Sequence, residues 1–494
     1  MKYTPSGSAG RAMNNAEQFE HTNCNWIRRG VSRMMYLSKF LPVIAYWMAV
    51  TVAANVFDPE NYAKADVIVS DVVVVGGGSS GTYAAINLRK MGQSVVVVER
   101  KKHLGGHTNT YTDDATGLTV DYGVQTFLNS SITVDYFAHF NISLVNYTRS
   151  NATISLADFN TGKPVFFYPS RNLTGWAVQI AQYPWLDFTW KIPQPVASDL
   201  LLPLGDFLVK YNLSDTAFNL YFGSQGISNP LQQLTVNVMK MVDRAYLRGI
   251  SGDMLSTANK NNSEIYAKAL TELGSNALVS STVTAAARPQ GGRGVSLVVK
   301  TPVGSKLVQA SKLLITIPPI LDNMRPFNLN LEELQIFSQW TSMGYYTLVL
   351  NNTGLPDGYQ WINADDSSAT YHIPQQPGAS EITSTHIPGV FYIWYRSPSH
   401  MTRLAVEQAA IRAIQNLQKA QNSTITNPNI IKFKSHTPFK LSVSAQAIQD
   451  GFYSDLYALQ GKRSTWYTGA AFISHNGGVL WKFTQALLPR IVAA

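Results

Sequence analysis

Residues 71–107 read DVVVVGGGSSGTYAAINLRKMGQSVVVVERKKHLGGH, and this stretch decides the fold. The β-branched run at 72–75 is too short to span a membrane and ends at glycines, which is typical of a buried parallel strand. Good helix formers follow at 82–91, and the valines at 95–98 predict the next buried strand. The order strand, glycine turn, helix, strand therefore predicts a βαβ unit at the start of an α/β fold.

The glycines of this turn have the spacing of a dinucleotide-binding loop. Gly76 permits the tight turn, Gly78 lets the backbone approach a pyrophosphate, and Gly81 lets the helix pack closely on the strand. The helix N-terminus suits a phosphate, and Ser80 adds a small hydroxyl there. Glu99 ends the second strand 18 positions after Gly81, near the separation of about 20 at which an acid binds a ribose. The pattern predicts a dinucleotide site, and the alternative is a βαβ unit without a ligand.

The segment that follows Glu99 resembles the flavin-containing amine oxidases and their relatives. The sequence LGGHT at 104–108 is similar to the glycine doublet that follows the ribose acid in that superfamily. The doublet is Gly105 and Gly106, and His107 stands where an arginine usually follows. This similarity favours FAD over NAD as the dinucleotide.

The end and the middle of the chain resemble the same superfamily. Residues 466–481, WYTGAAFISHNGGVLW, resemble the closing flavin motif, with Gly469 near the ribityl chain and a helix start at the isoalloxazine edge. Helix N-terminal amides at that edge would stabilise negative charge on a reduced flavin. Residues 274–283 and 313–319 are similar to the stretch where the chain re-enters the flavin domain, with a backbone group near Val283 at the adenine.

Within the superfamily, the chain most resembles the β-cyclopiazonate dehydrogenase-like group of FAD oxidoreductases. The shared stretches are GGHTNTY at 105–111, VDYGVQ at 120–125 and YTGAA at 467–471. Together with the glycine turn, the resemblance implies an enzyme that binds FAD non-covalently. The cofactor-binding residues are then Gly76, Gly78, Ser80, Gly81, Glu99, Arg100, Gly105, Gly106, His107, Thr108, Val283, Gly469, Ala470, Val479 and Leu480.

The resemblance also implies the domain organisation. A discontinuous Rossmann-like FAD-binding domain of α/β class is expected, with an inserted α+β substrate domain as in the amine oxidases. The expected FAD-binding segments are 67–128, 270–320 and 452–494, and the substrate domain takes 129–269 and 321–451.

Side-chain periodicity gives two further predictions in the substrate domain. Residues 402–420 predict a helix whose apolar face carries Leu404, Ile411, Ile414 and Leu417. Strands are predicted at 343–350 and 390–396. Their aromatic residues either line a substrate cavity or belong to the sheet core, and they are Tyr345, Tyr346, Tyr392, Trp394 and Tyr395.

Flavin chemistry needs neither a catalytic triad nor a metal cluster, and the nine histidines show no metal-binding spacing. His475 is the candidate acid or base, because a neutral imidazole beside the flavin moves protons near pH 7. The alternative is a histidine that hydrogen-bonds to flavin or backbone. Gln125 and Tyr122 are further catalytic candidates, since in relatives the VDYGVQ stretch passes near the isoalloxazine.

Two departures from the amine oxidases affect the expected reaction. Val479 occupies the place of an aromatic ring that frames the substrate nitrogen, and the strand at 343–350 lacks the lysine often found near flavin N5. The favoured function is therefore an FAD-dependent oxidoreductase, a dehydrogenase or oxidase. It would transfer a hydride from an unsaturated, aromatic or nitrogen-containing small molecule to N5. The alternatives are a flavin-dependent double-bond isomerase without net redox and a non-catalytic secreted flavin-binding protein.

Composition and the N-terminal region bear on the destination of the chain. Its formal charge is +9, but the expected leader at 1–54 holds six basic and two acidic side chains and so carries part of this charge. The sequence contains no block of five like charges, which argues against a nucleic-acid-binding surface. Basic residues precede an apolar run at 40–54, and Val52-Ala53-Ala54 offers small residues to signal peptidase. Because spanning a bilayer takes about 20 residues, cleavage and secretion are expected, with no stable membrane span afterwards. An anchor at 40–54 is the alternative.

Potential glycosylation sites also favour secretion. The nine N-x-Ser/Thr sequons begin at Asn129, Asn141, Asn146, Asn151, Asn172, Asn212, Asn261, Asn351 and Asn422. The only cysteine, Cys24, precedes the apolar run, so the mature chain is expected to have no disulfide and no cysteine-tethered flavin. The sequence does not indicate the oligomeric state.

Overall fold

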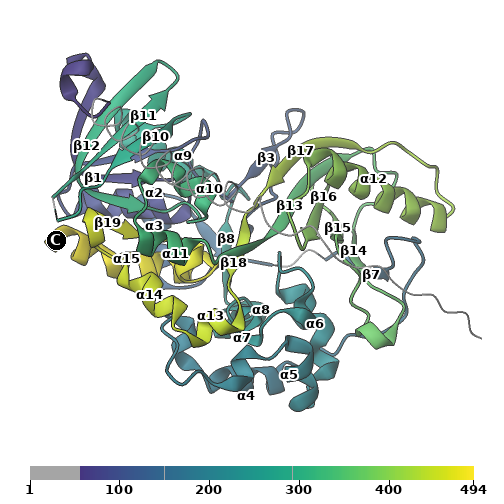
Figure 1. Ribbon diagram of the computed structural model, residues 1–494. Helices are drawn as coiled ribbons and strands as arrows, with labels where there is room; N and C mark the ends of the chain where they lie inside the picture. Colours follow the sequence, from purple (N-terminus) through teal and green to yellow (C-terminus); the bar gives the residue numbers. More distant parts are fainter. Residues whose placement is uncertain (1–55, 149–150, 292) are drawn as a thin grey trace, which may run out of the picture. The chain divides into compact units, whose positions relative to one another are not determined.

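The computed structural model describes residues 56–148, 151–291 and 293–494, which fall into two units. In the first unit, Met1–Asn61, only the end is described, and it contains the 3-10 turn η1 (Pro59–Asn61). The second unit, Tyr62–Ala494, contains the sheets and helices labelled in Figure 1. The predicted leader, with its alternative as a membrane anchor, lies outside the described residues. None of the described helices is both long enough and apolar enough to cross a membrane.

One seven-stranded sheet gathers strands from the front, the middle and the end of the chain (Figure 1). Its order is β10-β11-β12-β1-β2-β9, and β19 also pairs with β12. The strands are β1 (Val67–Val75), β2 (Val95–Val98), β9 (Ala277–Leu278), β10 (Thr282–Ala287), β11 (Val295–Thr301), β12 (Gly304–Ile315) and β19 (Thr465–Tyr467). Because β1, β2 and β19 run parallel to their neighbours, the turns that follow them leave from the same edge of the sheet.

Strand β12 has two different sets of neighbours. Its first half forms an antiparallel hairpin with β11, and its second half lies between β1 and β19 in parallel. The segment at 313–319, expected to re-enter the flavin domain, therefore begins within the parallel half of this strand.

Helices from both ends of the chain cover this sheet. Helix α2 (Ser79–Lys90) packs against α15 (Gly477–Ala493), and Tyr83 Oη donates to Gln485 Oε1 at 2.9 Å. The Trp481 ring stacks on Tyr83 with centroids 5.8 Å apart. Two more helices join the same core, namely α3 (Ser131–His139) and α9 (Glu264–Leu273). Short strands beside them are β3 (Thr110–Thr112), β4 (Thr119–Asp121), β5 (Phe127–Leu128), β6 (Leu144–Asn146) and β8 (Met254–Thr257).

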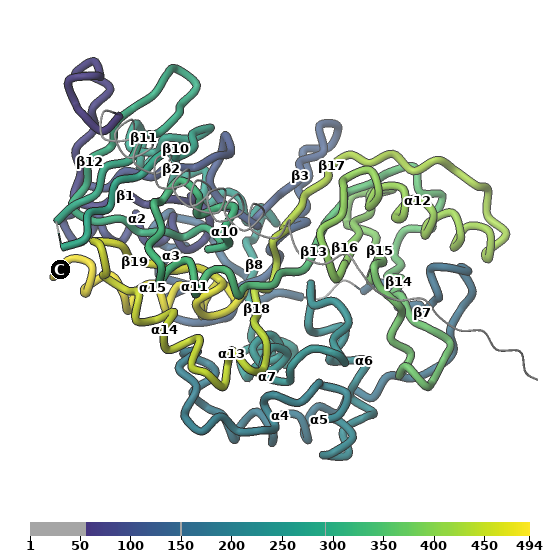
Figure 2. The backbone as a smooth tube through the Cα atoms, in the orientation of Figure 1, coloured from purple at the N-terminus to yellow at the C-terminus, as the bar shows by residue number. Residues whose placement is uncertain are grey.

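The second seven-stranded sheet has the order β17-β13-β16-β15-β14-β7, with β18 also paired to β13. Its strands are β7 (Thr153–Ala157), β13 (Thr341–Asn351), β14 (Tyr359–Asn363), β15 (Gly378–Ser384), β16 (Phe391–Ser397), β17 (Asn429–Ser435) and β18 (Phe439–Ser442). Figure 2 shows the backbone passing from β17 through β18 to α13 (Ala445–Gln449) near the middle of the view.

Helix α12 (Arg403–Ala420) covers one face of the second sheet. Ile414 and Leu417 are buried as predicted, but Leu404 is 63% exposed and Ile411 is only half-buried. The buried face instead carries Val406, Ala410 and Ala413. The prediction of this face was therefore wrong at Leu404, because residues 404 and 406 lie about 200° apart around the helix axis.

The predicted aromatic residues divide between the two faces of the second sheet. Tyr346 and Tyr395 lie in the core beneath α12. Tyr345 and Trp394 point to the other face, where they cluster with Phe439 of β18. This division follows from the two-residue period of a strand.

The helices at 174–250 share an apolar core with the first sheet. They are α4 (Thr174–Ala181), η3 (Pro184–Asp187), α5 (Leu204–Lys210), α6 (Ala217–Gly223), α7 (Thr235–Met239) and α8 (Arg244–Ile250). Later helices of the same unit are α10 (Leu321–Met324), α11 (Leu331–Phe337) and α14 (Phe452–Ala458).

A buried ion pair ties β19 to the neighbouring segments. Arg288 and Glu333 form two hydrogen bonds, of 2.7 Å between Nη1 and Oε1 and 2.9 Å between Nη2 and Oε2. Tyr467 Oη donates to Glu333 Oε1 at 2.6 Å, and Arg463 Nη1 donates to Oε2 at 3.0 Å. The pair thus fixes Tyr467 two residues before Gly469.

Candidate functional site

The glycine turn has the space that a dinucleotide needs. A Cβ at Gly81 would lie 1.9 Å from Gly76 O, so this glycine is required for packing of α2 on the turn. A Cβ at Gly78 would meet only Gly106 Cα, at 3.7 Å. Gly78 is therefore dispensable for packing, and its missing side chain leaves the backbone open to a ligand.

The glycine doublet closes the other side of this opening. Gly105 and Gly106 have φ values of +119° and +58°, which other residues rarely adopt. Gly105 N donates to Gly77 O at 2.8 Å, and a Cβ at Gly106 would lie 3.0 Å from Gly78 Cα. Two backbone segments without side chains therefore face each other. Thr108 is buried just beyond them, and its amide donates to Gly105 O at 2.9 Å.

Glu99 is buried at the end of β2, where a ribose acid is expected. Its Oε2 accepts from Gly77 N at 2.7 Å and its Oε1 accepts from Lys101 N at 2.8 Å. A carboxylate has about four acceptor positions, so capacity remains for ribose hydroxyls. Ser281 N donates to Glu99 O at 2.9 Å, which places β10 with Val283 at this end of the sheet. Arg100, in contrast, is exposed.

The C-terminal segment meets the glycine turn. A Cβ at Gly469 would lie 3.2 Å from Thr316 O and 3.9 Å from Ser80 Oγ. Trp481 Nε1 donates to Ser79 Oγ at 2.9 Å. The two distant motifs therefore lie side by side, and Ala470 follows Gly469 as a half-buried residue. Open glycine backbones, a buried acid and two helix N-termini fit a dinucleotide.

The first backbone amides of α15 are partly used within the chain. Asn476 is the N-cap, and its side chain already accepts from the amides of Gly478 and Val479. Val479 is half-buried and Leu480 is buried.

Three histidines gather beyond the doublet and α15. The ring centroids of His107 and His436 are 4.6 Å apart, and those of His107 and His475 are 6.3 Å apart with nearly parallel planes. Burial lowers the pKa of His107 to about 4, with Lys101 and Arg100 acting in the same direction. The pKa values of His436 and His475 also lie well below 6.5 because of burial, so all three rings are neutral at pH 7.

An aromatic wall extends from these histidines along the second sheet. Phe439 packs against His475 at 4.1 Å and against Tyr345 at 4.8 Å between ring centroids. Tyr345 shares a buried cluster with Trp394, whose ring lies 5.4 Å from that of Tyr392. The wall presents apolar rings next to neutral imidazoles, which suits an apolar or aromatic molecule.

A buried acid lies at the far end of this wall. Oε1 of Glu381 accepts from Thr383 at 2.5 Å, Gln360 at 2.9 Å and Tyr392 at 3.2 Å, whereas its Oε2 has no partner among the described residues. Burial raises the pKa of Glu381 despite these hydrogen bonds.

The structure separates the two candidates from the VDYGVQ stretch. Gln125 is half-buried and donates to Asp121 O at 3.0 Å. The Tyr122 ring instead packs in an apolar cluster with Val349 and Ile387, and burial raises its pKa to about 12. Catalytic roles for both remain predictions.

Comparisons with known proteins agree with this geometry. Residues 74–140 match the NAD(P)-binding Rossmann-like domain family. The chain is 39% identical over 459 residues to the FAD-dependent oxidoreductase pigF of Monascus ruber, covering 92% of this chain and 98% of that protein. It is 33% identical over 445 residues to β-cyclopiazonate dehydrogenase of Aspergillus oryzae, covering 87% of this chain and 94% of the relative.

The chain belongs to the FAD-dependent oxidoreductases. FAD is thus the dinucleotide cofactor of the chain, and the expected enzyme class and fold class are confirmed. Solved structures show the same fold for this oxidoreductase. A fatty acid isomerase from P. acnes has a TM-score of 0.67 at 16% identity, covering 85% of this chain and 98% of that one. Wild-type putrescine oxidase has a TM-score of 0.58 at 14% identity, covering 87% and 100%.

Sequence reasoning missed the residues that this FAD-dependent oxidoreductase brings from β17 and β18. His436, Phe439 and Lys440 lie around a proline that separates two strands. The sequence signal for these residues is a proline between two strands, with a histidine and a lysine two positions away on either side. Glu381 likewise stands out as an acid within an apolar strand.

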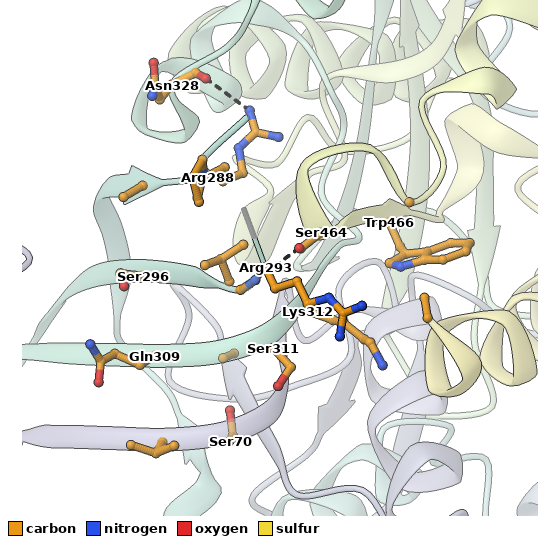
Figure 3. A pocket seen from close by; sticks show the side chains of 18 residues that line it. Ser70, Arg288, Arg293, Ser296, Gln309, Ser311, Lys312, Asn328, Ser464 and Trp466 are labelled. Carbon is orange, nitrogen blue, oxygen red and sulfur yellow. Dashed lines mark hydrogen bonds between the residues drawn. The ribbon is translucent and has the colours of Figure 1, made fainter. Parts of the chain in front are cut away.

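A separate pocket of about 840 Å³ lies on the first sheet, and neither the glycines of the turn at 76–81 nor the doublet at 105–106 line it. Figure 3 shows Arg293 and Lys312 at this pocket, with Gly294 N donating to Ser464 Oγ at 3.2 Å. Lys312 Nζ donates to Val492 O at 3.2 Å and is thereby used within the fold. This pocket is therefore distinct from the expected FAD site.

Proposed function

We propose that this FAD-dependent oxidoreductase dehydrogenates an unsaturated, aromatic or nitrogen-containing small molecule. The supporting observation is the aromatic wall of Tyr345, Trp394 and Phe439, which adjoins His475 beside the C-terminal flavin motif. Bound FAD supplies a hydride acceptor at N5, so the chain must place the substrate and move a proton. The wall would hold the substrate and exclude water, and His475 would accept the proton in its neutral form.

The test is anaerobic bleaching of the flavin absorption by a library of such molecules, followed by the mass of the product. We expect at least one compound to bleach the flavin and to lose two hydrogens. Bleaching by none of them, or a product of unchanged mass, would contradict dehydrogenation. Unchanged mass would indicate the isomerase alternative. We also expect denaturation to release free FAD. The single cysteine, Cys24, precedes the expected cleavage site, so the cleaved chain would have no cysteine to tether the flavin.

Replacing His475 by glutamine should slow flavin reduction by the active compound roughly tenfold to a hundredfold. Because the pKa of His475 lies well below 6.5, the ratio of wild-type to variant rates should stay constant between about pH 6 and 8. Single-turnover kinetics measure both quantities. His400→Gln is the control, since His400 is exposed. Equal rates for all three proteins would argue against a proton-transfer role.

We further propose that the oxidoreductase is exported and glycosylated. The asparagines of seven sequons are exposed, whereas Asn261 and Asn351 are half-buried. N-terminal sequencing of protein from the culture medium, with its mass before and after deglycosylation, tests this proposal. An intact N-terminus on unglycosylated cellular protein would contradict it.

A further inference from the structure

Two buried lysines share one aromatic ring near the proposed site. Lys440 and Lys240 are only 5% and 3% exposed. Their Nζ atoms lie 5.1 Å and 5.0 Å from the centroid of the Trp190 ring. Burial of an ammonium group is costly unless a partner compensates it, so each lysine requires an explanation.

The fold accounts for Lys240. Its Nζ donates to Leu186 O at 2.5 Å, and the carboxylates of Asp243 and Asp187 act to raise its pKa. Lys240 therefore has both hydrogen-bond acceptors and opposite charges around it.

The fold does not account for Lys440. No hydrogen bond or ion pair involves its Nζ among the described residues, and Lys240 is the charged group that acts on its pKa. Its backbone has φ +47°, a conformation that costs about 1–3 kcal/mol in a residue other than glycine. A strained, buried lysine whose amine has no hydrogen-bond or ion-pair partner among the described residues points to a bound ligand.

The neighbouring polar groups lack the same kind of partner. Tyr453 stacks on Trp190 with centroids 4.2 Å apart, and Trp340 packs against Tyr453 at 6.3 Å. The Tyr453 hydroxyl and the Trp340 indole N–H are both buried without a partner among the described residues. Lys440 and Tyr453 both contact Trp190, and Trp340 contacts Tyr453, so this cluster holds three hydrogen-bond donors without an acceptor among the described residues. An anion would supply it.

The position of Lys440 connects this cluster to the cofactor. Strand β18, which carries Lys440, lies against η11 (Ala470–Phe472) of the C-terminal flavin motif. The preceding residue, Phe439, packs on His475, and the charge of Lys440 contributes to the low pKa of His475. Lys440 therefore follows directly on a residue that contacts His475, and its charge acts on that histidine.

We propose that Lys440 binds an anionic group of the substrate, a carboxylate or an enolate, with Lys240 and the Tyr453 and Trp340 donors completing the subsite. The inference rests on the proposed function and names the chemical class of its substrate. Lys440 would then orient a substrate that is held against the aromatic wall.

The charges around the subsite define a pH dependence. Burial lowers the pKa of Lys440 to about 7, and Lys240 acts in the same direction. Burial also lowers the pKa of Lys240 to about 7 and raises that of Asp243 to about 6. His475 stays neutral. Both lysines therefore lose charge as the pH rises through about 7, so anion affinity should fall at least tenfold between about pH 6.5 and 8.5.

The experiment measures binding of phenylacetate and of neutral phenylacetamide to the oxidised, FAD-loaded enzyme through changes in the flavin spectrum. Wild type should prefer the anion. Lys440→Met should weaken phenylacetate binding about tenfold or more without changing phenylacetamide binding, and Lys440→Arg should retain the preference. The methionine variant should fold, because apolar replacement of a buried charge is often neutral or stabilising. Lys163→Met is the exposed control and should match wild type.

The FAD content and the flavin redox potential of each variant are recorded in the same experiment. Equal phenylacetate affinity in wild type and Lys440→Met, or no anion preference in wild type, would overturn the inference. A changed potential with unchanged probe affinity would also overturn it, since the lysine would then serve the cofactor. Failure of wild type to bind FAD would refute the proposed function instead.

Discussion

Replacing Gly78 by valine should abolish FAD binding while leaving the polypeptide folded. A Cβ at this position meets nothing closer than Gly106 Cα at 3.7 Å, and the φ of −75° is accessible to any residue. The added methyl groups would extend over the glycine turn at the N-terminus of α2, where the pyrophosphate is expected to lie. We expect FAD affinity to fall at least ~1000-fold, which corresponds to about 4 kcal/mol.

Two glycine variants control this prediction. Gly205→Ala in α5 has its nearest contact at 3.4 Å and should bind FAD as wild type does. Gly81→Ala would place a Cβ 1.9 Å from Gly76 O, so it should lose both FAD and stability. Fluorescence titration of apoprotein with FAD, together with circular dichroism, separates the three cases. A Gly78→Val protein that retains tight FAD binding would show that the pyrophosphate lies elsewhere.

Removing the Glu333 carboxylate should destabilise the oxidoreductase by about 3–5 kcal/mol, because Arg288 would become an unpaired buried charge. The Glu333 and Arg288 side chains are 4% and 0% exposed. Burial alone would raise the pKa of Glu333, but hydrogen bonds from Arg288 and Tyr467 outweigh it and lower the pKa. The stabilisation is therefore present above the ordinary carboxyl pKa and is lost as the pH falls through the lowered value.

Glu332 provides a matched control in the same helix. It pairs with Lys462 at 2.6 Å, but both side chains are exposed, so Glu332→Ala should cost less than about 1 kcal/mol. Urea unfolding of Glu333→Ala, Glu332→Ala and wild type, at equal excess FAD, measures the difference in the free energy of unfolding. Similar losses for both variants would contradict a specific role of the buried pair.

Local sequence patterns predicted the strand, glycine turn, helix and strand at 71–99 well, because their geometry depends on short-range constraints. The positive φ of Gly76 and the place of Glu99 directly after β2 follow from turn chemistry and strand length, whereas Gly105 was expected from the family resemblance. The close approach of Gly469 to Ser80 could be inferred only from the family resemblance, since nearly 400 residues separate the two segments.

The substrate side could be predicted less well for physical reasons. A two-residue period places Tyr345 and Tyr346 on opposite faces of β13, but it does not say which face α12 covers. The buried face of α12 was likewise set by the sheet beneath it. His436 and Lys440 acquire their neighbours only through long-range packing, and no local pattern places them beside His475.

The central claim is that one FAD is held jointly by the glycine turn at 76–81 and by the C-terminal segment. Hydrogen–deuterium exchange of the apoprotein, before and after FAD is added, tests this claim most directly. We predict slower exchange in both segments, 76–82 and 469–480, when FAD binds. Slower exchange in only one of them would contradict the account.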